Sequence, residues 1–72
     1  NSPSDFYNRI KDLAKERGET FGEIASKLTF PRTYFYVWIK KNTLPLPEYA
    51  IEIAKYFNVS LDYLFGRSDY RK

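Results

Sequence analysis

The stretch FPRTYFYVWIKKN, which runs from Phe30 to Asn42, sets aromatic and basic residues side by side. It holds five aromatic residues and three basic residues but no acidic one. A solvent-exposed loop does not need so many rings, and an ordinary core helix does not end in two lysines. The segment is therefore expected to have one side in the core and another side that meets a partner.

A helical wheel separates these two sides. At about 100° per residue, Phe35 and Trp38 fall on one side of a helix, and Phe30 precedes them. The three rings are predicted to be core, because aromatic residues at helical spacing are usually buried. The outward side has two cations and no acid, with Tyr34 on its shoulder, and consists of Arg32, Thr33, Tyr36, Val37 and Lys40.

The rest of the chain is also helical in its pattern, because apolar residues recur at helical spacing almost throughout. Helices are expected over residues 3–17, 21 to 28 or 29, 31 to 40 or 41, 47–57 and 61–65. Thr20 and Glu23 have the spacing of a capping box at the start of the second helix. Only about three residues join the second helix to the third, which forces a steep crossing. The predicted fold is all-α: a compact five-helix bundle with a central helix-turn-helix.

Length and composition set further limits. The 72 residues allow one domain, expected over residues 1–66, with 67–72 as a frayed tail or the start of a linker to a missing C-terminal region. The absence of cysteine and histidine excludes disulfides and the common zinc sites, so no metal and no cofactor are expected. No apolar run approaches the ~20 residues of a membrane span. The lack of cysteine fits a reducing compartment, and we expect a cytoplasmic protein.

The net charge of +3 is small, but the positive excess is concentrated. From residue 24 to residue 47 there is no acid, and the four cations there are Lys27, Arg32, Lys40 and Lys41. The remaining residues hold 8 basic and 9 acidic side chains, a net of −1. A localised basic stripe favours a phosphate-bearing partner, although charge alone is equally compatible with a solvated face.

Several motifs, taken in order, carry a resemblance to a known family. They are RIKDLAKERG, T-x-x-EIASKL, Phe35-x-x-Trp38, Pro45 and IAKYFNVSLDYLFG. Their order and spacing, over about four-fifths of the chain, resemble the lambda-repressor-like helix-turn-helix domain of the Xre/Cro type. The resemblance implies sequence-specific binding of double-stranded DNA by a bacterial or phage transcriptional regulator, most often a repressor, with the third helix in the major groove.

The resemblance also implies roles for individual residues. Base-reading positions are Arg32, Thr33, Tyr36 and Val37. Phosphate-binding positions are Thr20, Phe21, Tyr34, Lys40, Lys41 and Asn42. A dimer contact is implied at Leu61, Tyr63 and Leu64. A homodimer, formed on DNA or through a missing C-terminal domain, predicts a palindromic operator.

Ala14 and Ile39 stand where relatives often pair an arginine with an acid, and three further departures concern the DNA contact and the turn. Relatives often have glutamine where this chain has Phe21, so a phosphate contact there rests on backbone alone, or Phe21 is core. Thr29 stands where a glycine often takes a left-handed conformation, which suggests a rearranged turn. Pro31 replaces the usual serine cap of the third helix. The last two departures leave the orientation of that helix open.

Three other functions compete with duplex binding. Catalysis is disfavoured because the chain lacks histidine and cysteine, and because Asp12, Glu16 and Glu52 are interpreted as solvated helix faces. Exposed Tyr34 and Tyr36 beside cations would suit an RNA or single-stranded DNA binder. A protein-interaction module that kept the fold and lost DNA binding is the third. Salt separates duplex binding from the protein-interaction module, because duplex binding weakens steeply as salt rises and an aromatic protein interface barely responds.

Overall fold

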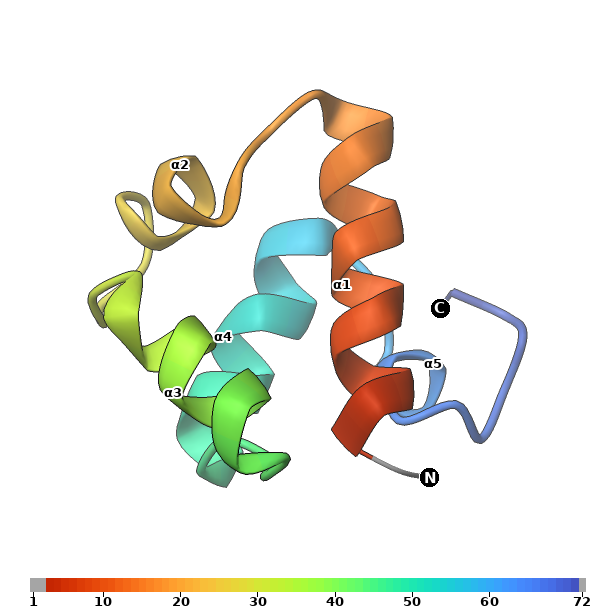
Figure 1. Cartoon of the computed structure of the whole chain (residues 1–72). Coiled ribbons are helices and arrows are strands. Elements are labelled where there is room, and N and C mark those ends of the chain that lie inside the picture. The colour runs from red at the N-terminus through yellow and green to blue at the C-terminus, as the bar shows by residue number, and fades with distance from the viewer. Residues whose placement is uncertain (1–2, 72) are drawn as a thin grey trace.

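The computed structural model describes residues 3–71 of the chain. Over those residues it contains five helices and no strand: α1 (Pro3–Arg17), α2 (Phe21–Ala25), α3 (Thr33–Lys41), α4 (Pro47–Phe57) and α5 (Leu61–Leu64). Figure 1 shows α2 and α3 on one side of the upright α1, α5 on its other side, and α4 behind. The predicted all-α fold is confirmed.

All five helices contribute to one core. The largest fully buried side chains are Phe6 and Ile10 of α1, Ile24 of α2, Phe35 of α3, Ile53 of α4 and Leu64 of α5. Phe30 is buried as predicted, whereas Trp38 is only half-buried. Because each helix is too short to be stable alone, this shared core is what fixes the position of α3.

Local capping interactions mark the start or the end of most helices at the positions that the sequence predicts. Thr20 and Glu23 form the expected capping box at the start of α2. Asn42 and Asn58 both take the left-handed conformation, with φ of 55° and 58°, just after α3 and α4. The Ser60 hydroxyl caps α5 by accepting from the Tyr63 backbone N–H. These caps satisfy backbone groups that a helix end leaves unpaired.

The turn between α2 and α3 is longer than predicted. The second helix ends at Ala25 rather than at residue 28 or 29. The Ser26 hydroxyl donates to the Glu23 carbonyl, and the Lys27 N–H donates instead to Ile24, three residues back. A side chain has thus taken the carbonyl that would continue the helix.

The third helix also begins later than predicted, at Thr33 rather than near residue 31. The first backbone bonds here run from Tyr34 to Pro31 and from Phe35 to Arg32, again three residues back. Residues 31–32 therefore form a tight turn ahead of the α-helix.

The turn is fastened to α4 by Glu52. The Thr29 N–H donates to one Glu52 carboxylate oxygen at 3.0 Å, and the Thr29 hydroxyl donates to the other. Thr29 is not left-handed, since Asn42 and Asn58 are the only non-glycine residues with positive φ in the described range. The left-handed conformation that the family pattern favours at this position is therefore absent, and Glu52, interpreted as part of a solvated helix face, also holds the turn.

The segment after Gly66 lies against the helices. Residues 67–71 turn back toward α1, where the Arg71 guanidinium forms two hydrogen bonds with the Glu16 carboxylate. The Arg71 carbonyl accepts from the Ser60 N–H, and Arg9 pairs with Asp69 at 3.2 Å. Lys72, the last residue of the predicted tail, lies outside the described residues.

The carboxylate of Glu19 is the centre of a cluster of charged and polar side chains that joins α1, the turn after α2, and α4. The Glu19 carboxylate accepts from the Tyr56 hydroxyl at 2.5 Å and from Lys27 at 2.9 Å, and it pairs with Arg17 at 3.0 Å. The Tyr56 and Lys27 hydrogen bonds hold the pKa of Glu19 below its usual value of 4.5. The cluster links the end of α1 to the end of α2 and to α4.

We expect Glu19→Gln to lower the Tm at pH 7, because the amide keeps the shape but loses the charge. A depressed folded-state pKa contributes stability that is present above the unfolded pKa and is lost as pH falls through the folded value. The Tm difference between the two proteins should therefore shrink below pH 4.5. Thermal unfolding at pH 7 and in acid measures this, and a difference that persists in acid would contradict the ionic role.

Candidate nucleic-acid interface

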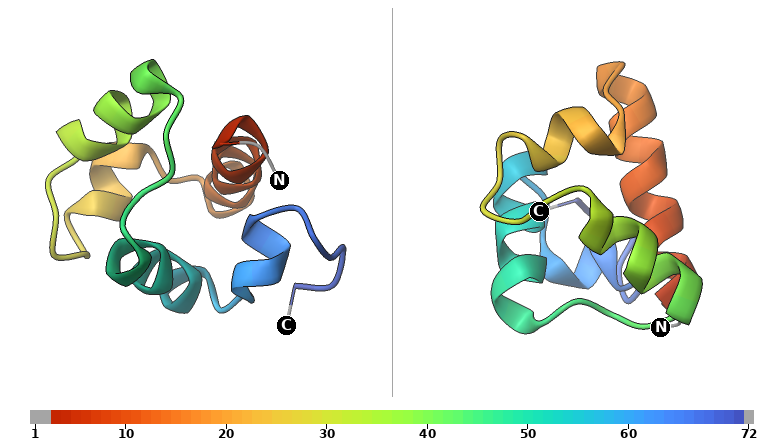
Figure 2. Two further views of the ribbon diagram at one scale, coloured as in Figure 1. Left: turned by 90° about the horizontal axis from the view of Figure 1, so that it is seen from below. Right: turned by 60° about the vertical axis from the view of Figure 1, so that its left-hand side comes forward.

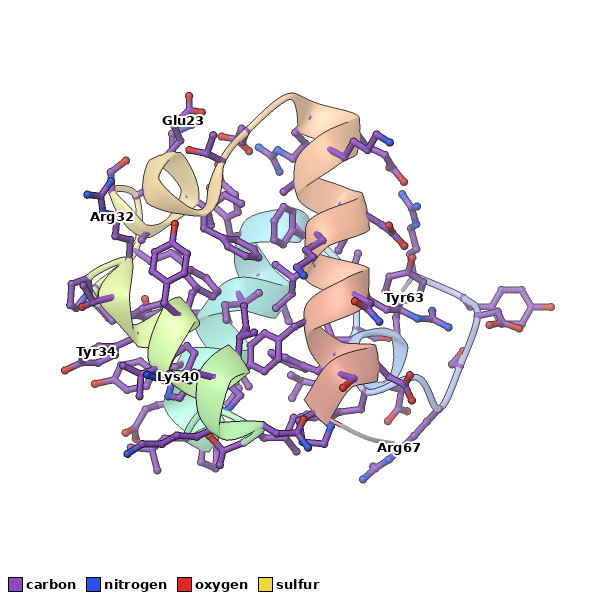
Figure 3. All side chains as sticks on the ribbon, in the orientation of Figure 1. Glu23, Arg32, Tyr34, Lys40, Tyr63 and Arg67 are labelled. Carbon is purple, nitrogen blue, oxygen red and sulfur yellow. The ribbon has the colours of Figure 1, made fainter. Side chains whose placement is uncertain are left out.

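The outer side of α3 is exposed, as the helical wheel predicts. Thr33, Tyr36, Val37 and Lys40 are all exposed, with Tyr36 at 53% and Val37 at 46%. Arg32 stands just before the helix. Figure 3 shows the side chains of Arg32 and Tyr34 reaching outward near the start of α3. The structure therefore brings the predicted base-reading residues together on one acid-free face.

Arg32 lies against the neighbouring helix, beside Gly22. A Cβ atom added at Gly22 would come 3.4 Å from Arg32 Cδ and 3.5 Å from Nη1. These are ordinary van der Waals distances, so the stem of Arg32 packs against α2 at this position. Arg32 makes no ion pair within residues 3–71, so its guanidinium has no competing carboxylate there.

Phe21 is part of the aromatic packing rather than an exposed contact. Its ring stacks on Phe35 with centroids 4.8 Å apart and meets the edge of Tyr36 at 6.4 Å. Any phosphate contact at Phe21 therefore has to use its backbone. The packing also supports Tyr36, which places the start of α2 directly beside the outer face of α3.

Thr20 is already engaged by the capping box. Its hydroxyl accepts from the Glu23 N–H at 3.1 Å, and its own N–H donates to the Glu23 carboxylate at 3.0 Å. These two bonds use donors that the predicted phosphate contact would also need, and they place a carboxylate at the start of α2. The predicted phosphate contact at Thr20 and Phe21 therefore depends on those backbone N–H groups in the first turn of α2 that the capping box does not use.

The far end of α3 is held firmly. The Tyr7 hydroxyl of α1 donates to the Thr43 carbonyl at 2.9 Å, and burial raises the pKa of Tyr7 well above its usual value. Tyr7 therefore stays protonated and keeps this bond at all ordinary pH values. Lys40 and Lys41 occupy the last turn, where cations also interact favourably with the helix dipole.

The cations of the chain divide into two groups. One group is paired with carboxylates: Arg9 with Asp69, Arg17 and Lys27 with Glu19, Arg67 with Asp62, and Arg71 with Glu16. The other described cations make no ion pair in residues 3–71, and they are Lys11, Lys15, Arg32, Lys40, Lys41 and Lys55. Lys27, which the sequence placed in the basic stripe, is therefore neutralised, and two lysines of α1 take its place.

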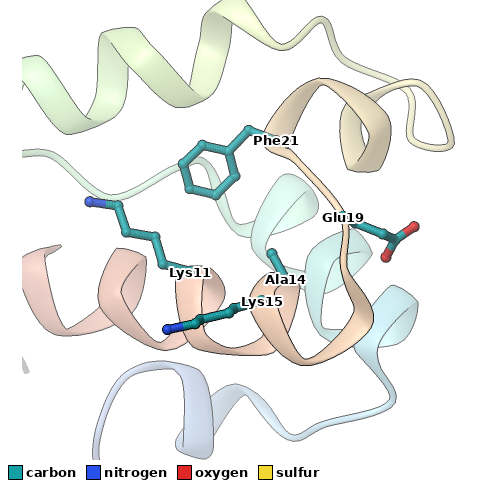
Figure 4. Close-up of a pocket in the computed structure, with 5 residues that line it drawn as sticks. All are labelled: Lys11, Ala14, Lys15, Glu19 and Phe21. Carbon is teal, nitrogen blue, oxygen red and sulfur yellow. The ribbon is translucent and has the colours of Figure 1, made fainter.

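Lys11 and Lys15 lie one turn apart on α1, facing α2. Together with Ala14, Glu19 and Phe21 they line an open hollow of about 320 Å³. Figure 4 shows both lysines extending to the same side, while the Glu19 carboxylate points away from them. Because Phe21 also touches Tyr36, the basic surface runs from α1 across Phe21 to α3.

Sequence reasoning missed these two lysines because α1 as a whole carries balanced charge. The signal was nevertheless present in the helical period. On a wheel Lys15 lies about 40° from Lys11, and Asp12 and Glu16 follow on the same side at about 100° and 140°. One side of α1 is therefore basic, and Glu16 on the neighbouring side pairs with Arg71.

The predicted dimer contact on α5 is largely inside the molecule. Leu64 is 0% exposed and Tyr63 is 8% exposed, while Leu61 is half-buried. The guanidinium groups of Arg9 and Arg71 lie over the Tyr63 ring, with their Cζ atoms 4.3 Å and 5.5 Å from its centroid. The core and the C-terminal segment cover Tyr63 and Leu64 in this structure, as expected if α5 completes the core, and a dimer contact on α5 stays a prediction.

Other kinds of site find no support in the described part of the chain. Among residues 3–71, no three histidine, cysteine, aspartate or glutamate side chains gather in a way that could hold a metal ion. None of the described helices has the length and apolar character needed to cross a membrane.

Comparison with known proteins gives one finding. A family model described as the bacteriophage CI repressor helix-turn-helix domain matches residues 5–71. The match spans all five helices and includes the segment that folds back after Gly66. No curated protein and no solved structure matches the chain.

Proposed function

The chain belongs to the bacteriophage CI repressor helix-turn-helix domain family, a family of DNA-binding transcription regulators, and we propose on that basis that it reads a specific duplex sequence as a repressor. The observation that carries the proposal is the outer face of α3. It is exposed, acid-free and flanked by cations that make no ion pair in the described residues. Such a face suits the major groove, into which an α-helix fits.

Base reading is assigned to the exposed side chains of α3 and the residue before it. Arg32 is the strongest candidate, because its fork of donors matches the O6 and N7 acceptors of guanine. Thr33 and Val37 carry methyl groups of the right size to meet a thymine methyl. Tyr36, supported by Phe21, stands beside them and is exposed.

Backbone contacts are assigned to the cations around this face. Lys40, Lys41 and Asn42 lie at the end of α3, and Tyr34 flanks its start. Lys11 and Lys15 extend the same surface onto α1. Phosphate contacts of this kind fix the position of a protein on DNA and supply salt-dependent affinity, without reading sequence.

The arrangement of the tyrosines disfavours a single-stranded nucleic acid as the target. Tyr36 packs on Phe21, whereas Tyr34 stacks on Phe30 with ring centroids 5.9 Å apart. The two rings lie on opposite flanks of α3, about 200° apart on a wheel, so they offer no continuous platform for successive bases. We assign no catalytic role, and we expect the domain to act on duplex DNA in the cytoplasm.

The proposal is tested by selecting bound duplexes from a random pool at near-physiological salt and sequencing them. We expect an enriched palindrome whose half-sites lie about one DNA turn, ~34 Å, apart. A pool that binds without enrichment would mean backbone affinity alone and would refute base reading by Arg32 and Thr33. No binding at all would refute the function and direct attention to a protein partner.

A further inference from the structure

The third helix is anchored to the core by fewer buried side chains than α1 or α4. Among its nine residues only Phe35 is buried, and Trp38 and Ile39 are partly buried, whereas α4 buries four of its eleven residues. Burial of apolar surface holds a helix against the core, but this attraction has no direction of its own. One buried ring therefore fixes the position of α3 without fixing its tilt.

Hydrogen bonds from two other helices hold the chain on either side of α3. Before the helix, the N–H and the hydroxyl of Thr29 both donate to the Glu52 carboxylate of α4. After it, the Thr43 carbonyl accepts from the Tyr7 hydroxyl of α1 at 2.9 Å. Figure 2 shows the turn before α3 beside α4, and the end of α3 near the start of α1. Because hydrogen bonds are directional, these two ties restrain the tilt that the core leaves open.

Short and rigid segments join both ties to α3. Between Thr29 and the helix, Phe30 is buried and Pro31 has a φ that its ring fixes. At the other end, the Thr43 N–H donates to the Trp38 carbonyl. A displacement at either tie is therefore passed on to the helix rather than absorbed by a loop.

We propose that Glu52 and Tyr7 are positioning residues, which set the orientation of α3 in the major groove although neither belongs to its outer face. The inference rests on the proposed function, because reading bases requires a fixed orientation. A helix of nine residues is about 14 Å long, so a tilt of about 5° around one tie moves the other end by about 1 Å. Hydrogen bonds to base edges weaken steeply when they are misaligned, whereas flexible lysine side chains adapt their contacts to phosphates. Loss of a tie should therefore lower discrimination between sequences and spare non-specific affinity.

The test measures the affinity of each variant for the duplex selected from the random pool and for an unrelated duplex, well below every Tm. Glu52→Ala removes the first tie, and Tyr7→Phe removes the second while keeping the ring. Glu48→Ala is the matched control for the loss of an acid, since Glu48 is exposed in the first turn of α4. Tyr56→Phe is the matched control for the loss of a hydroxyl, since Tyr56 bonds to Glu19 and not to a residue flanking α3.

We expect Glu52→Ala to lower the ratio of specific to non-specific affinity about tenfold, which corresponds to the loss of one base contact. Tyr7→Phe should lower this ratio about threefold, because it removes one hydrogen bond rather than two. The slope of log affinity against log salt should stay unchanged, since no cation is lost. Glu52→Gln should keep most of the discrimination, because its amide oxygen accepts from the Thr29 N–H and its amino group can donate to the hydroxyl.

A lowered Tm with unchanged discrimination in Glu52→Ala or Tyr7→Phe would overturn the inference, since that tie would then serve stability alone. An equal loss of discrimination in Glu48→Ala or Tyr56→Phe would also overturn it, since the cause would be charge or general loosening. A parent chain that does not discriminate would instead refute the proposed function. Residual dipolar couplings of the free protein test the ties without DNA: we expect α3 to reorient relative to α1 and α4 in the two variants and not in the controls, and an unchanged orientation would contradict the inference.

Discussion

An Arg32→Ala variant is expected to lose about 1–3 kcal/mol of discrimination at a single base-pair position in each half-site, with little change elsewhere. The guanidinium stands at the start of α3 beside Gly22 and makes no ion pair in residues 3–71. Its removal deletes one set of donors in the groove and leaves the aromatic core untouched. Competition of the selected duplex against its single-base variants measures the loss position by position.

Lys41→Ala provides the contrast. Lys41 is assigned to a phosphate, so its removal should weaken every duplex about equally and lower the slope of log affinity against log salt by about 0.9. If Arg32→Ala and Lys41→Ala gave the same profile across sequences, the division between reading and positioning residues would be wrong.

The double variant Lys11→Ala/Lys15→Ala is expected to lower the salt slope by about 1.8, since two phosphate contacts are removed. Both ammonium groups line the hollow beside Phe21, and neither takes part in an ion pair within the described chain. The loss should be the same for specific and non-specific duplexes, because these contacts carry no sequence information. Binding isotherms across a series of salt concentrations give the slope directly.

Lys55→Ala is the matched control for this measurement. Lys55 also makes no ion pair in residues 3–71, but it lies on the exposed side of α4, the helix behind α1 and α3 in Figure 1. Lys55→Ala should change the slope of log affinity against log salt by less than half of what the loss of one phosphate contact gives. If Lys55→Ala lowered the slope as much as loss of a lysine on α1, the effect would reflect net charge rather than a surface that meets DNA.

The starts of α2 and α5 and the ends of α3 and α4 could be predicted from the sequence, because each of these caps depends on neighbouring residues. The capping box of Thr20 and Glu23 spans three residues, and Asn42 and Asn58 end their helices through their own backbone conformations. Ser60 likewise acts on a backbone group three residues away. A pattern confined to one turn of helix can be recognised without knowing what lies across the molecule.

Apart from the early end of α2 and the late start of α3, the features that the sequence did not predict are contacts between residues far apart in the chain. Glu52 reaches Thr29 across 23 positions, and Arg71 reaches Glu16 across 55. Each of these acids has an ordinary helical setting, so its periodicity indicated only a solvated face. The basic surface was underestimated for a related reason. Lys27 is neutralised by Glu19, while Lys11 and Lys15 join α3 only through the packing of Phe21.

The bond between Glu52 and Thr29 bears on how the binding preference of this domain could be redesigned. Grafting a foreign recognition helix onto a scaffold assumes that the helix is a portable cassette. Here the turn leading into α3 is held by a side chain of α4, through the bonds from Thr29 to Glu52. A transplant confined to residues 33–41 would leave that tie behind. A working graft has to carry the turn and Glu52 together.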